Sequence, residues 1–373
     1  MKILIDARLY GLENAGLGRY VMNLLSELAK IDKKNEYAVF LRKEYFKRLK
    51  FPKNFKKVLA DFRHYGLREQ INLPFMISKL DPDLVHFPHF NVPLAYKGKF
   101  VTTIHDIVMH KNKGSDTTNL PLPIYFIKRV GYKKVFEKAV KGSQKVIVPS
   151  EFSKKELMDF YHINEDKVAV TYEGVDKREL SKQKASEVLK KYDLTNPYLI
   201  YVGNAYPHKN LKRAITAVVD YNLKTSQKIN FAIVSSRSIF LERTKELVRK
   251  LEAGEFVKLL GFVPDDELNT LYSKSLGFIY PSTYEGFGLP GLEAMAAGTV
   301  ALVSEIPVFK EIYQDKAIYF NPFDSNAIER AIKDVVLMDK TKRQRMINAG
   351  KAFVKRYSWA KMAKETLEVY KSV

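Results

Sequence analysis

The chain has 373 residues, no cysteine and a formal net charge of +21, and 46% of its residues are hydrophobic. This length predicts two domains of similar size, and the composition predicts ordered domains with large apolar cores. The lack of cysteine excludes disulfides, thiolate catalysis and cysteine-ligated zinc, and it fits a reducing compartment. No stretch approaches the ~18 consecutive apolar residues of a spanning helix, so any membrane contact is expected to be peripheral.

The first half of the chain alternates strand and helix signals. Lys2 to Asp6 is an apolar run that reads as a first strand rather than a signal peptide. A loop with Gly11, Gly16 and Gly18 follows, and the helical spacing of "RYVMNLLSELAKI" predicts a helix after it. Further strands are expected at residues 36–41, 84–87, 100–106 and 145–150.

The second half repeats this alternation after "YDLTNP". Strands are expected at 198–204, 229–236, 257–263, 276–282 and 300–305, with helices between them. Such alternation predicts an α/β fold of two Rossmann-like domains with parallel sheets, whose ligands lie at the carboxyl ends of the strands. We place the first domain at 1–185 and the second domain at 186–356. The final amphipathic helix, 357–373, is expected to pack back onto the first domain.

One stretch, "STYEGFGLPGLEAMAAG" (282–298), concentrates glycines and two glutamates. Pro290 suits the first turn of a helix that ends before Gly298, and the amides of 286–289 would then face the strand-end crevice. Glu285 lies in the loop and Glu293 one turn inside the helix, so the two can hold separate parts of one elongated ligand. Taken singly, Glu285 could equally well be a helix cap and Glu293 a solvated charge; the combination is more specific.

These residues resemble a known family, the retaining nucleotide-sugar glycosyltransferases of family 4, which have the GT-B fold. The resemblance covers nearly the whole chain and rests on "EGFGLPGLEAMAAG", "YVGNAYPHKN", "TIHDI", "VPSEFSKKEL", "LGFVPDDEL" and "GLGRY". It is strongest toward bacterial mannosyltransferases of polysaccharide assembly.

The resemblance implies roles for individual residues. Glu285 and the backbone after it would contact the transferred sugar, Glu293 the ribose, Lys209 the diphosphate and His105 a sugar hydroxyl. The expected catalytic residues are therefore His105, Glu285 and Lys209. The expected donor-binding residues are Gly16, Leu17, Gly18, Asn204, Lys209, Ser235, Phe262, Val263, Gly286, Phe287, Gly288, Leu289 and Glu293. The resemblance also implies that the first domain, 1–185, is the acceptor side and that the second, 186–356, binds the nucleotide sugar. On the acceptor side we expect Tyr10, His89 and Asp106.

One position departs from the family pattern. The usual arginine after the glycine of "YVG" is replaced by Asn204, which can donate a hydrogen bond but brings no charge. His208, Arg213 or Arg237 could supply the missing positive charge. The departure puts the geometry at the diphosphate in doubt more than the reaction.

The sequence disfavours a dinucleotide site, a metal site and a glycosidase site. Gly16 and Gly18 lack the third glycine of a dinucleotide fingerprint, which argues against a dehydrogenase. "DPD" at 81–83 could bind a metal but reads better as a turn, and "HFPHF" at 86–90 is weak evidence for zinc. A glycosidase needs Glu285 and Glu293 to face each other across one bond, which a loop and a following helix make improbable.

The positive charge is concentrated in two stretches of the first half. Residues 41–80 carry eleven Lys/Arg and three Asp/Glu, and residues 111–145 carry nine and two. Both interleave aromatic and basic residues, which favours an anionic membrane surface over a merely solvated face. The charge also suits a nucleic-acid-binding protein, but that function would explain neither the glutamate pair nor "TIHD".

The leading hypothesis is a retaining hexosyltransferase that moves a sugar from a nucleotide sugar to a hydroxyl of a glycan or lipid-linked glycan. GDP-mannose is the preferred donor and a UDP-hexose such as UDP-glucose is the alternative. We expect no required metal or cofactor and no nucleic-acid partner. The expected location is cytoplasmic, peripheral at the inner face of the membrane.

Overall fold

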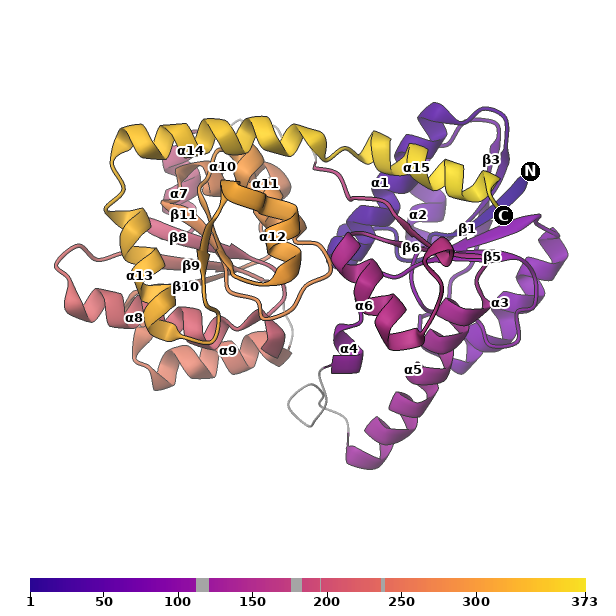
Figure 1. Ribbon diagram of the computed structural model, residues 1–373, viewed down its shortest axis with the longest axis horizontal. Helices are drawn as coiled ribbons and strands as arrows, with labels where there is room; N and C mark the ends of the chain where they lie inside the picture. The colour runs from indigo at the N-terminus through magenta and orange to yellow at the C-terminus, as the bar shows by residue number, and fades with distance from the viewer. Residues whose placement is uncertain (112–120, 176–182, 195, 236–238) are drawn as a thin grey trace. The chain divides into compact units, whose positions relative to one another are not determined.

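The chain forms two compact units (Figure 1). The computed structural model describes residues 1–111, 121–175, 183–194, 196–235 and 239–373. Unit 1 comprises Met1–Gly174 and Ser358–Val373, and unit 2 comprises Val175–Tyr357. The division expected from the sequence, between residues 185 and 186, lies slightly later in the chain than this one. Among the described residues, no helix combines the length and apolarity needed to cross a bilayer.

Unit 1 is built on a parallel sheet. In the described part of the chain this sheet has seven strands in the order β3-β2-β1-β4-β5-β6-β7. The first strand pairs with β2 on one side and β4 on the other, with Ile3 opposite Tyr37 and Leu84. The strands are short apolar runs because helices cover both faces. They are β1 (Lys2–Asp6), β2 (Glu36–Leu41), β3 (Phe55–Leu59), β4 (Leu84–Phe87), β5 (Phe100–Thr103), β6 (Lys145–Val148) and β7 (Val168–Val170).

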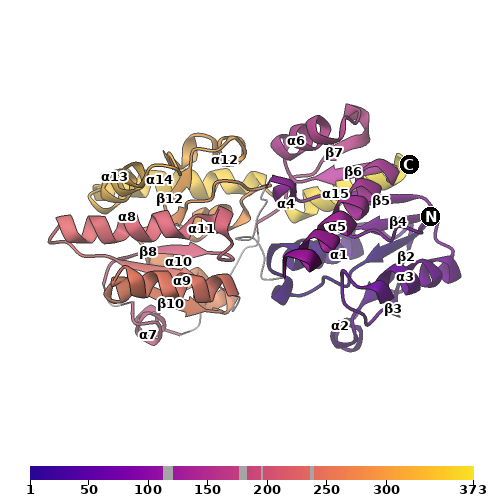
Figure 2. The ribbon, with the colours of Figure 1, turned by 90° about the horizontal axis from the view of Figure 1, so that it is seen from below.

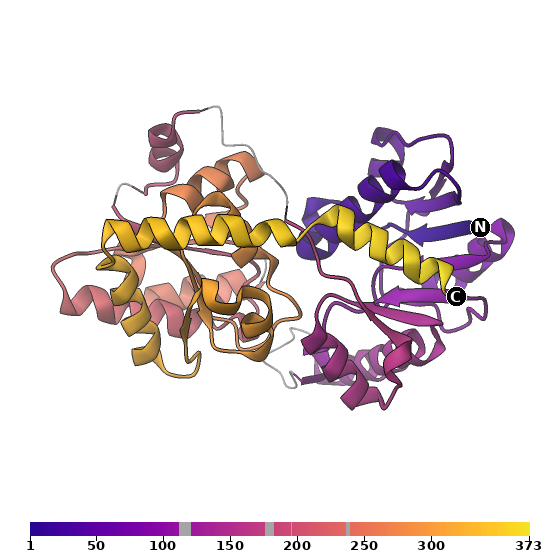
Figure 3. The ribbon, with the colours of Figure 1, turned by 45° about the horizontal axis from the view of Figure 1, so that its top comes forward.

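Right-handed crossovers divide the helices of unit 1 between the two faces of this sheet. They place α1 and α2 on one face and α3, α5 and α6 on the other, as Figures 1 and 2 show. The C-terminal helix α15 packs beside α1 (Figure 3). Its Met362 and Tyr370 are fully buried. The helices are α1 (Ala15–Ile31), α2 (Lys43–Arg48), α3 (Leu67–Leu80), α4 (Val108–Lys111), α5 (Leu122–Gly142), α6 (Glu151–Tyr161) and α15 (Trp359–Lys371).

Unit 2 repeats the architecture with a parallel sheet that has six strands among the described residues, in the order β10-β9-β8-β11-β12-β13. Helix α13 packs against α8, and α14 against α11. The strands are β8 (Tyr198–Val202), β9 (Asn230–Val234), β10 (Val257–Gly261), β11 (Gly277–Tyr280), β12 (Ala301–Ser304) and β13 (Ile318–Phe320). The helices are α7 (Ala185–Lys191), α8 (Leu211–Lys224), α9 (Ile239–Lys250), α10 (Asp265–Lys274), α11 (Leu289–Ala297), α12 (Pro307–Tyr313), α13 (Ser325–Val336) and α14 (Lys340–Phe353).

The predicted glycine loop before the first long helix is wrong in one respect, because α1 begins at Ala15 and not after Gly18. Gly16 and Gly18 therefore lie in its first turn. A Cβ at Gly18 would lie 1.8 Å from the carbonyl oxygen of Gly11, so glycine there lets the preceding turn close against the helix. Three short strands, β3, β7 and β13, were not predicted.

Candidate active site

Two charged side chains from different loops of unit 2 meet at the carboxyl edge of its sheet. Lys209 ends a short 3₁₀ turn, Pro207–Lys209, after β8, and Glu285 lies in the loop between β11 and α11. The Lys209 Nζ and the Glu285 Oε1 are 2.6 Å apart, and the two side chains are only 14% and 11% exposed. The backbone N–H of Thr283 donates to the carbonyl oxygen of His208 at 2.8 Å and so ties the two loops together.

The protonation states of Glu285 and His208 depend on burial and on the charges beside them. Burial raises the pKa of Glu285, but Lys209 and His208 more than offset that effect, so the pKa lies below its usual value and the carboxylate is ionised. Burial, with the charge of Lys209 as a second cause, lowers the pKa of His208 to about 4. His208 is therefore neutral at neutral pH in this arrangement.

The other residues considered for the charge of the missing arginine are placed differently. The guanidinium of Arg213 donates to the side-chain oxygen of Asn210 at 3.0 Å, and Arg237 lies outside the described residues. The carbonyl oxygen of Asn204 accepts a hydrogen bond from the Tyr201 hydroxyl at 2.7 Å, which fixes the backbone just after β8. Lys209 is thus the cation that the structure places beside Glu285.

The amino end of α11 is shaped by glycine. Gly288 precedes the helix with φ +114°, and its carbonyl oxygen accepts a hydrogen bond from the buried Tyr313 hydroxyl. A Cβ at Gly288 would lie 2.6 Å from that hydroxyl oxygen, so a larger residue would have to displace it. The helix has no side-chain N-cap and carries Pro290 in its first turn, as the sequence predicted. Pro290 has no N–H and the Gly291 N–H donates to the carbonyl oxygen of Gly288 at 3.2 Å, so among the first three residues of the helix the Leu289 N–H is the donor left for a ligand.

The remaining expected donor-binding residues of unit 2 follow strand ends or lie on α11. Glu293 is on α11 and buried, one turn from the helix start. Ser235 follows β9 and is buried, while Phe262 and Val263 follow β10, the former exposed and the latter buried. Because β8, β9 and β10 are neighbours in a parallel sheet, these residues share its carboxyl edge with Lys209.

His105 occupies the corresponding edge of unit 1, just after β5. Its Nδ1 lies 3.3 Å from the Glu173 Oε1 and its Nε2 lies 3.1 Å from the carbonyl oxygen of Pro88. The Tyr20 ring packs edge-on against the His105 ring, with the two ring centroids 4.8 Å apart. Glu173 was not among the site residues predicted from the sequence. It follows β7, a strand that was also not predicted, and its position just after a strand is the signal that could have identified it.

The other expected residues of unit 1 have mixed surroundings. Asp106 accepts a hydrogen bond from the backbone N–H of Val108 at 2.8 Å and so caps a turn. Tyr10 packs against Tyr45 with ring centroids 4.9 Å apart. The Nε2 of His89 lies 3.5 Å from the hydroxyl oxygen of Tyr65. Gly16, Leu17 and Gly18 form the first turn of α1.

The alternative metal sites are absent from the described residues, which contain no cluster of three or more metal-ligating side chains. His86 is a core residue, because its two ring nitrogens lie 2.6 Å from the Tyr370 hydroxyl and 2.9 Å from the Thr103 hydroxyl. Asp83 of "DPD" accepts from the backbone N–H of Lys2 at 2.7 Å, and Asp81 adopts φ +45°, which makes the segment a turn.

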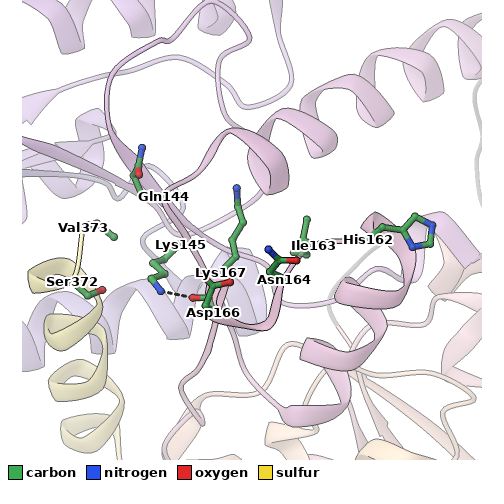
Figure 4. A pocket seen from close by; sticks show the side chains of 9 residues that line it. All are labelled: Gln144, Lys145, His162, Ile163, Asn164, Asp166, Lys167, Ser372 and Val373. Carbon is green, nitrogen blue, oxygen red and sulfur yellow. Dashed lines mark hydrogen bonds between the residues drawn. The ribbon is translucent and has the colours of Figure 1, made fainter.

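A hollow of about 430 Å³ lies at the opposite edge of the first sheet (Figure 4). It is lined by Gln144 and Lys145 at the start of β6, by Asp166 and Lys167 before β7, and by the end of the C-terminal segment. Lys145 Nζ donates to the carbonyl oxygen of Asp166. The hollow is thus at the amino ends of the strands, away from the edge that carries His105.

Comparison with protein families matches both parts of the chain. A model described as Glycosyl transferases group 1 matches residues 182–371, and one described as Glycosyltransferase Family 4 matches residues 15–179. The chain is 33% identical to the O-antigen chain mannosyltransferase RfbU of Salmonella typhimurium over 238 residues, 63% of this chain and 64% of that protein. It is 26% identical to the O-antigen chain mannosyltransferase B of Escherichia coli, over the whole length of both.

Solved structures share the fold. The sucrose-phosphate synthase of Thermosynechococcus elongatus has a TM-score of 0.77 at 17% identity, with 100% of this chain and 98% of that one covered. Anabaena Alr3699/HepE, crystallised with UDP and glucose, has a TM-score of 0.76 at 16% identity over the whole of both chains. Both are similar in architecture, which is the GT-B fold. With its two sheets, its family matches and these relatives, the chain belongs to the group 1 glycosyltransferases and is a family 4 enzyme.

Proposed function

We propose that this enzyme moves a hexose from a nucleoside diphosphate sugar to a hydroxyl of a glycan or lipid-linked glycan, with retention of anomeric configuration. GDP-mannose is the proposed donor, because the relatives quoted above are mannosyltransferases. A UDP-hexose is the alternative, favoured by the UDP found with a structural neighbour. The reaction is proposed to need neither a metal nor a cofactor.

The observation that carries the proposal is the Lys209–Glu285 pair beside the uncapped start of α11. A departing diphosphate needs positive charge and N–H donors, which Lys209 and the Leu289 N–H at the start of α11 offer. A sugar needs hydrogen-bond acceptors for its hydroxyls, which Glu285 offers as a carboxylate. Glu293, buried on the same helix, is assigned to the ribose hydroxyls.

The proposed step is a front-face displacement. The acceptor oxygen forms a bond to the anomeric carbon while the bond from that carbon to the phosphate oxygen breaks. The departing phosphate oxygen takes the proton of the acceptor hydroxyl, so no protein base is required. His105, held between Glu173 and Pro88, is assigned to orient a hydroxyl of the transferred sugar.

We also propose contact with an anionic membrane surface on the cytoplasmic side. Leu67, Ile71 and Phe75 form a stripe along α3 at spacings of one helical turn, and all are more than half exposed. Phe126, Ile127 and Val130 of α5 are similarly exposed on the same side of the sheet. Five Lys or Arg residues follow Ile127 on α5 before its last turn, which suits a surface of acidic headgroups: Lys128, Arg129, Lys133, Lys134 and Lys138.

Nucleotide binding tests the assignment of the donor. Thermal unfolding is followed with GDP, UDP, ADP, GDP-mannose and UDP-glucose, each with and without EDTA. One nucleotide at 100 times its dissociation constant should stabilise the enzyme by about 2.7 kcal/mol. Glu293→Ala should abolish that shift, whereas Glu305→Ala, an exposed acid of the same unit that pairs with Lys310, should keep it.

Three results would contradict parts of the proposal. If no nucleotide shifts unfolding, the donor site is wrong; if EDTA abolishes the shift, metal independence is wrong. The anomeric configuration is read by NMR on the product formed with a labelled donor and a lipid-linked glycan fraction. A product of inverted configuration would overturn the retaining mechanism.

A further inference from the structure

A cluster of buried polar side chains lies at the carboxyl edge of the sheet in unit 1. The Arg8 guanidinium forms two hydrogen bonds with Asp6, through Nε at 2.7 Å and Nη2 at 2.6 Å, and its Nη2 also donates to Glu69 at 2.6 Å. Asn91 donates to the same Glu69 oxygen at 2.6 Å. Arg8 is only 1% exposed and Glu69 is fully buried. The charged groups of this cluster are therefore held rigidly.

Several polar atoms of this cluster have no hydrogen-bond partner among the described residues. They are Arg8 Nη1, the Nε2 of His64 and the Nδ1 of His89. The His64 Nδ1 lies 3.4 Å from the Glu69 carboxylate, which places it beside Arg8. Leaving a buried polar group unpaired costs about 1 to 3 kcal/mol, so three such side chains together indicate a place for a polar ligand.

An aromatic ring borders these atoms on a strained turn. Tyr65 adopts φ +64°, which is unusual for a bulky side chain, and its backbone N–H donates to the Glu69 Oε2 at 2.7 Å. Its side chain is 63% exposed, and its ring centroid lies about 6 Å from those of His64, His89 and Phe90. The turn thus presents an open aromatic face next to buried polar atoms.

The chemistry of the cluster favours a neutral polyhydroxyl ligand. Asp6 and Glu69 bring two negative charges against the one positive charge of Arg8, and burial lowers the pKa of His89, which is therefore neutral. An anion would be repelled by the two carboxylates. Sugar hydroxyls both donate and accept, which matches a guanidinium donor and two imidazoles, and the apolar face of a sugar ring can pack on Tyr65.

We propose that Arg8, His64, Tyr65 and His89 form a subsite for one hexose of the acceptor glycan. This inference rests on the proposed transferase function, since it identifies where that acceptor lies. The His105 Nε2 lies 3.1 Å from the carbonyl oxygen of Pro88, the residue before His89, which places the subsite next to the residue assigned to the transferred sugar. Sequence reasoning had named only His89 of this group, because the others come from segments far apart along the chain.

Ligand-observed NMR on the full chain tests the subsite. The probes are the methyl α-pyranosides of mannose, glucose and galactose, titrated with and without whichever of GDP and UDP binds; inorganic phosphate is the anionic comparison. At least one glycoside should bind, and Tyr65→Ala should weaken its binding about tenfold, or about 1.4 kcal/mol. His64→Ala should weaken it as well. Leu67→Ala, an exposed residue two positions from Tyr65, should stay within about twofold of the parent.

The outcomes separate this inference from the proposed function. If a nucleotide binds but no glycoside does, or if Tyr65→Ala and His64→Ala bind glycoside like the parent, the subsite is wrong and the donor site stands. Phosphate binding that both variants lose, without any glycoside binding, would also overturn it. If neither nucleotides nor glycosides bind, both proposals fail. Unfolding temperatures close to that of the parent show that the variants fold.

Discussion

The ammonium of Lys209 lies 2.6 Å from the carboxylate of Glu285, so the two groups assigned to the donor already contact each other. Both side chains are largely buried, and removing one partner of such a pair leaves a desolvated charge. We expect Lys209→Met to lower the free energy of unfolding by about 3 kcal/mol. The double variant Lys209→Met, Glu285→Gln should recover much of that loss, because it leaves no unpaired charge. Urea unfolding of the single and double variants measures the coupling. Equal stabilities of Lys209→Met and the double variant would contradict it.

As the pH falls below 6.5, the free energy of unfolding should decrease because of His86, before most carboxylates take up protons. Burial lowers the pKa of His86 to about 3, whereas the unfolded chain takes up this proton near pH 6.5. Above pH 6.5 the residue is neutral in both states and has no effect. Below it only the unfolded state gains the proton, so stability falls as pH drops, by up to about 1.4 kcal/mol per pH unit.

His86→Asn is the matched test of that pH dependence. At pH 7.5 the variant should have a lower free energy of unfolding than the parent, because the hydrogen bonds to Tyr370 and Thr103 are lost. Between pH 6.5 and 4.5, however, its free energy of unfolding should fall less than that of the parent. The measurement is the urea midpoint across that range. Parallel pH profiles for the two proteins would show that His86 is not the group responsible.

Glu173 is expected to position His105. Glu173→Ala removes the acceptor 3.3 Å from the His105 Nδ1 and leaves the ring held by Pro88 at the Nε2. We expect kcat to fall about tenfold through the loosened ring, while the affinity for the nucleotide is unchanged. Glu137→Ala, which removes an exposed acid of the same unit, is the control. A change in nucleotide affinity as large as that in kcat would argue for a general structural defect instead.

Membrane contact should depend on the exposed side chains of α3 and α5. Ile71→Asp and Ile127→Asp each replace an exposed apolar group with an acid, and each should weaken binding to vesicles of phosphatidylcholine and phosphatidylglycerol about tenfold. Leu223→Asp makes a matched change on α8 of unit 2 and should have little effect. Co-sedimentation at low and high salt provides the measurement. Equal losses in all three variants would indicate a loss of net charge rather than a defined surface.

The sequence was most informative where local rules act. The bounds of α11 followed from Pro290 and Gly298, since both residues have strong positional preferences at helix ends. The strands of unit 1 that were predicted are continuous apolar runs. The strand β3 was missed because "FKKVL" places two lysines side by side at the edge of the sheet, and β7 because three residues give too little pattern.

What the sequence could not supply was the pairing of distant segments. Nothing local relates Arg8 to Glu69, or His105 to Glu173, although each pair is in contact. The same limit applies to charge: the basic stretch 41–80 looked like one surface, but α2 and α3 lie on opposite faces of the sheet. Spatial neighbours of this kind depend on strand order, which composition and periodicity do not encode.

Helix α15 gives the enzyme a particular order of assembly. It belongs to unit 1, where it buries Trp359, Met362 and Tyr370, yet it is synthesised after the whole of unit 2. A nascent chain on the ribosome therefore cannot finish its first unit until α15 emerges, whereas the second unit can close earlier. A premature stop near residue 357 would accordingly impair the earliest-made half of the protein more than the latest.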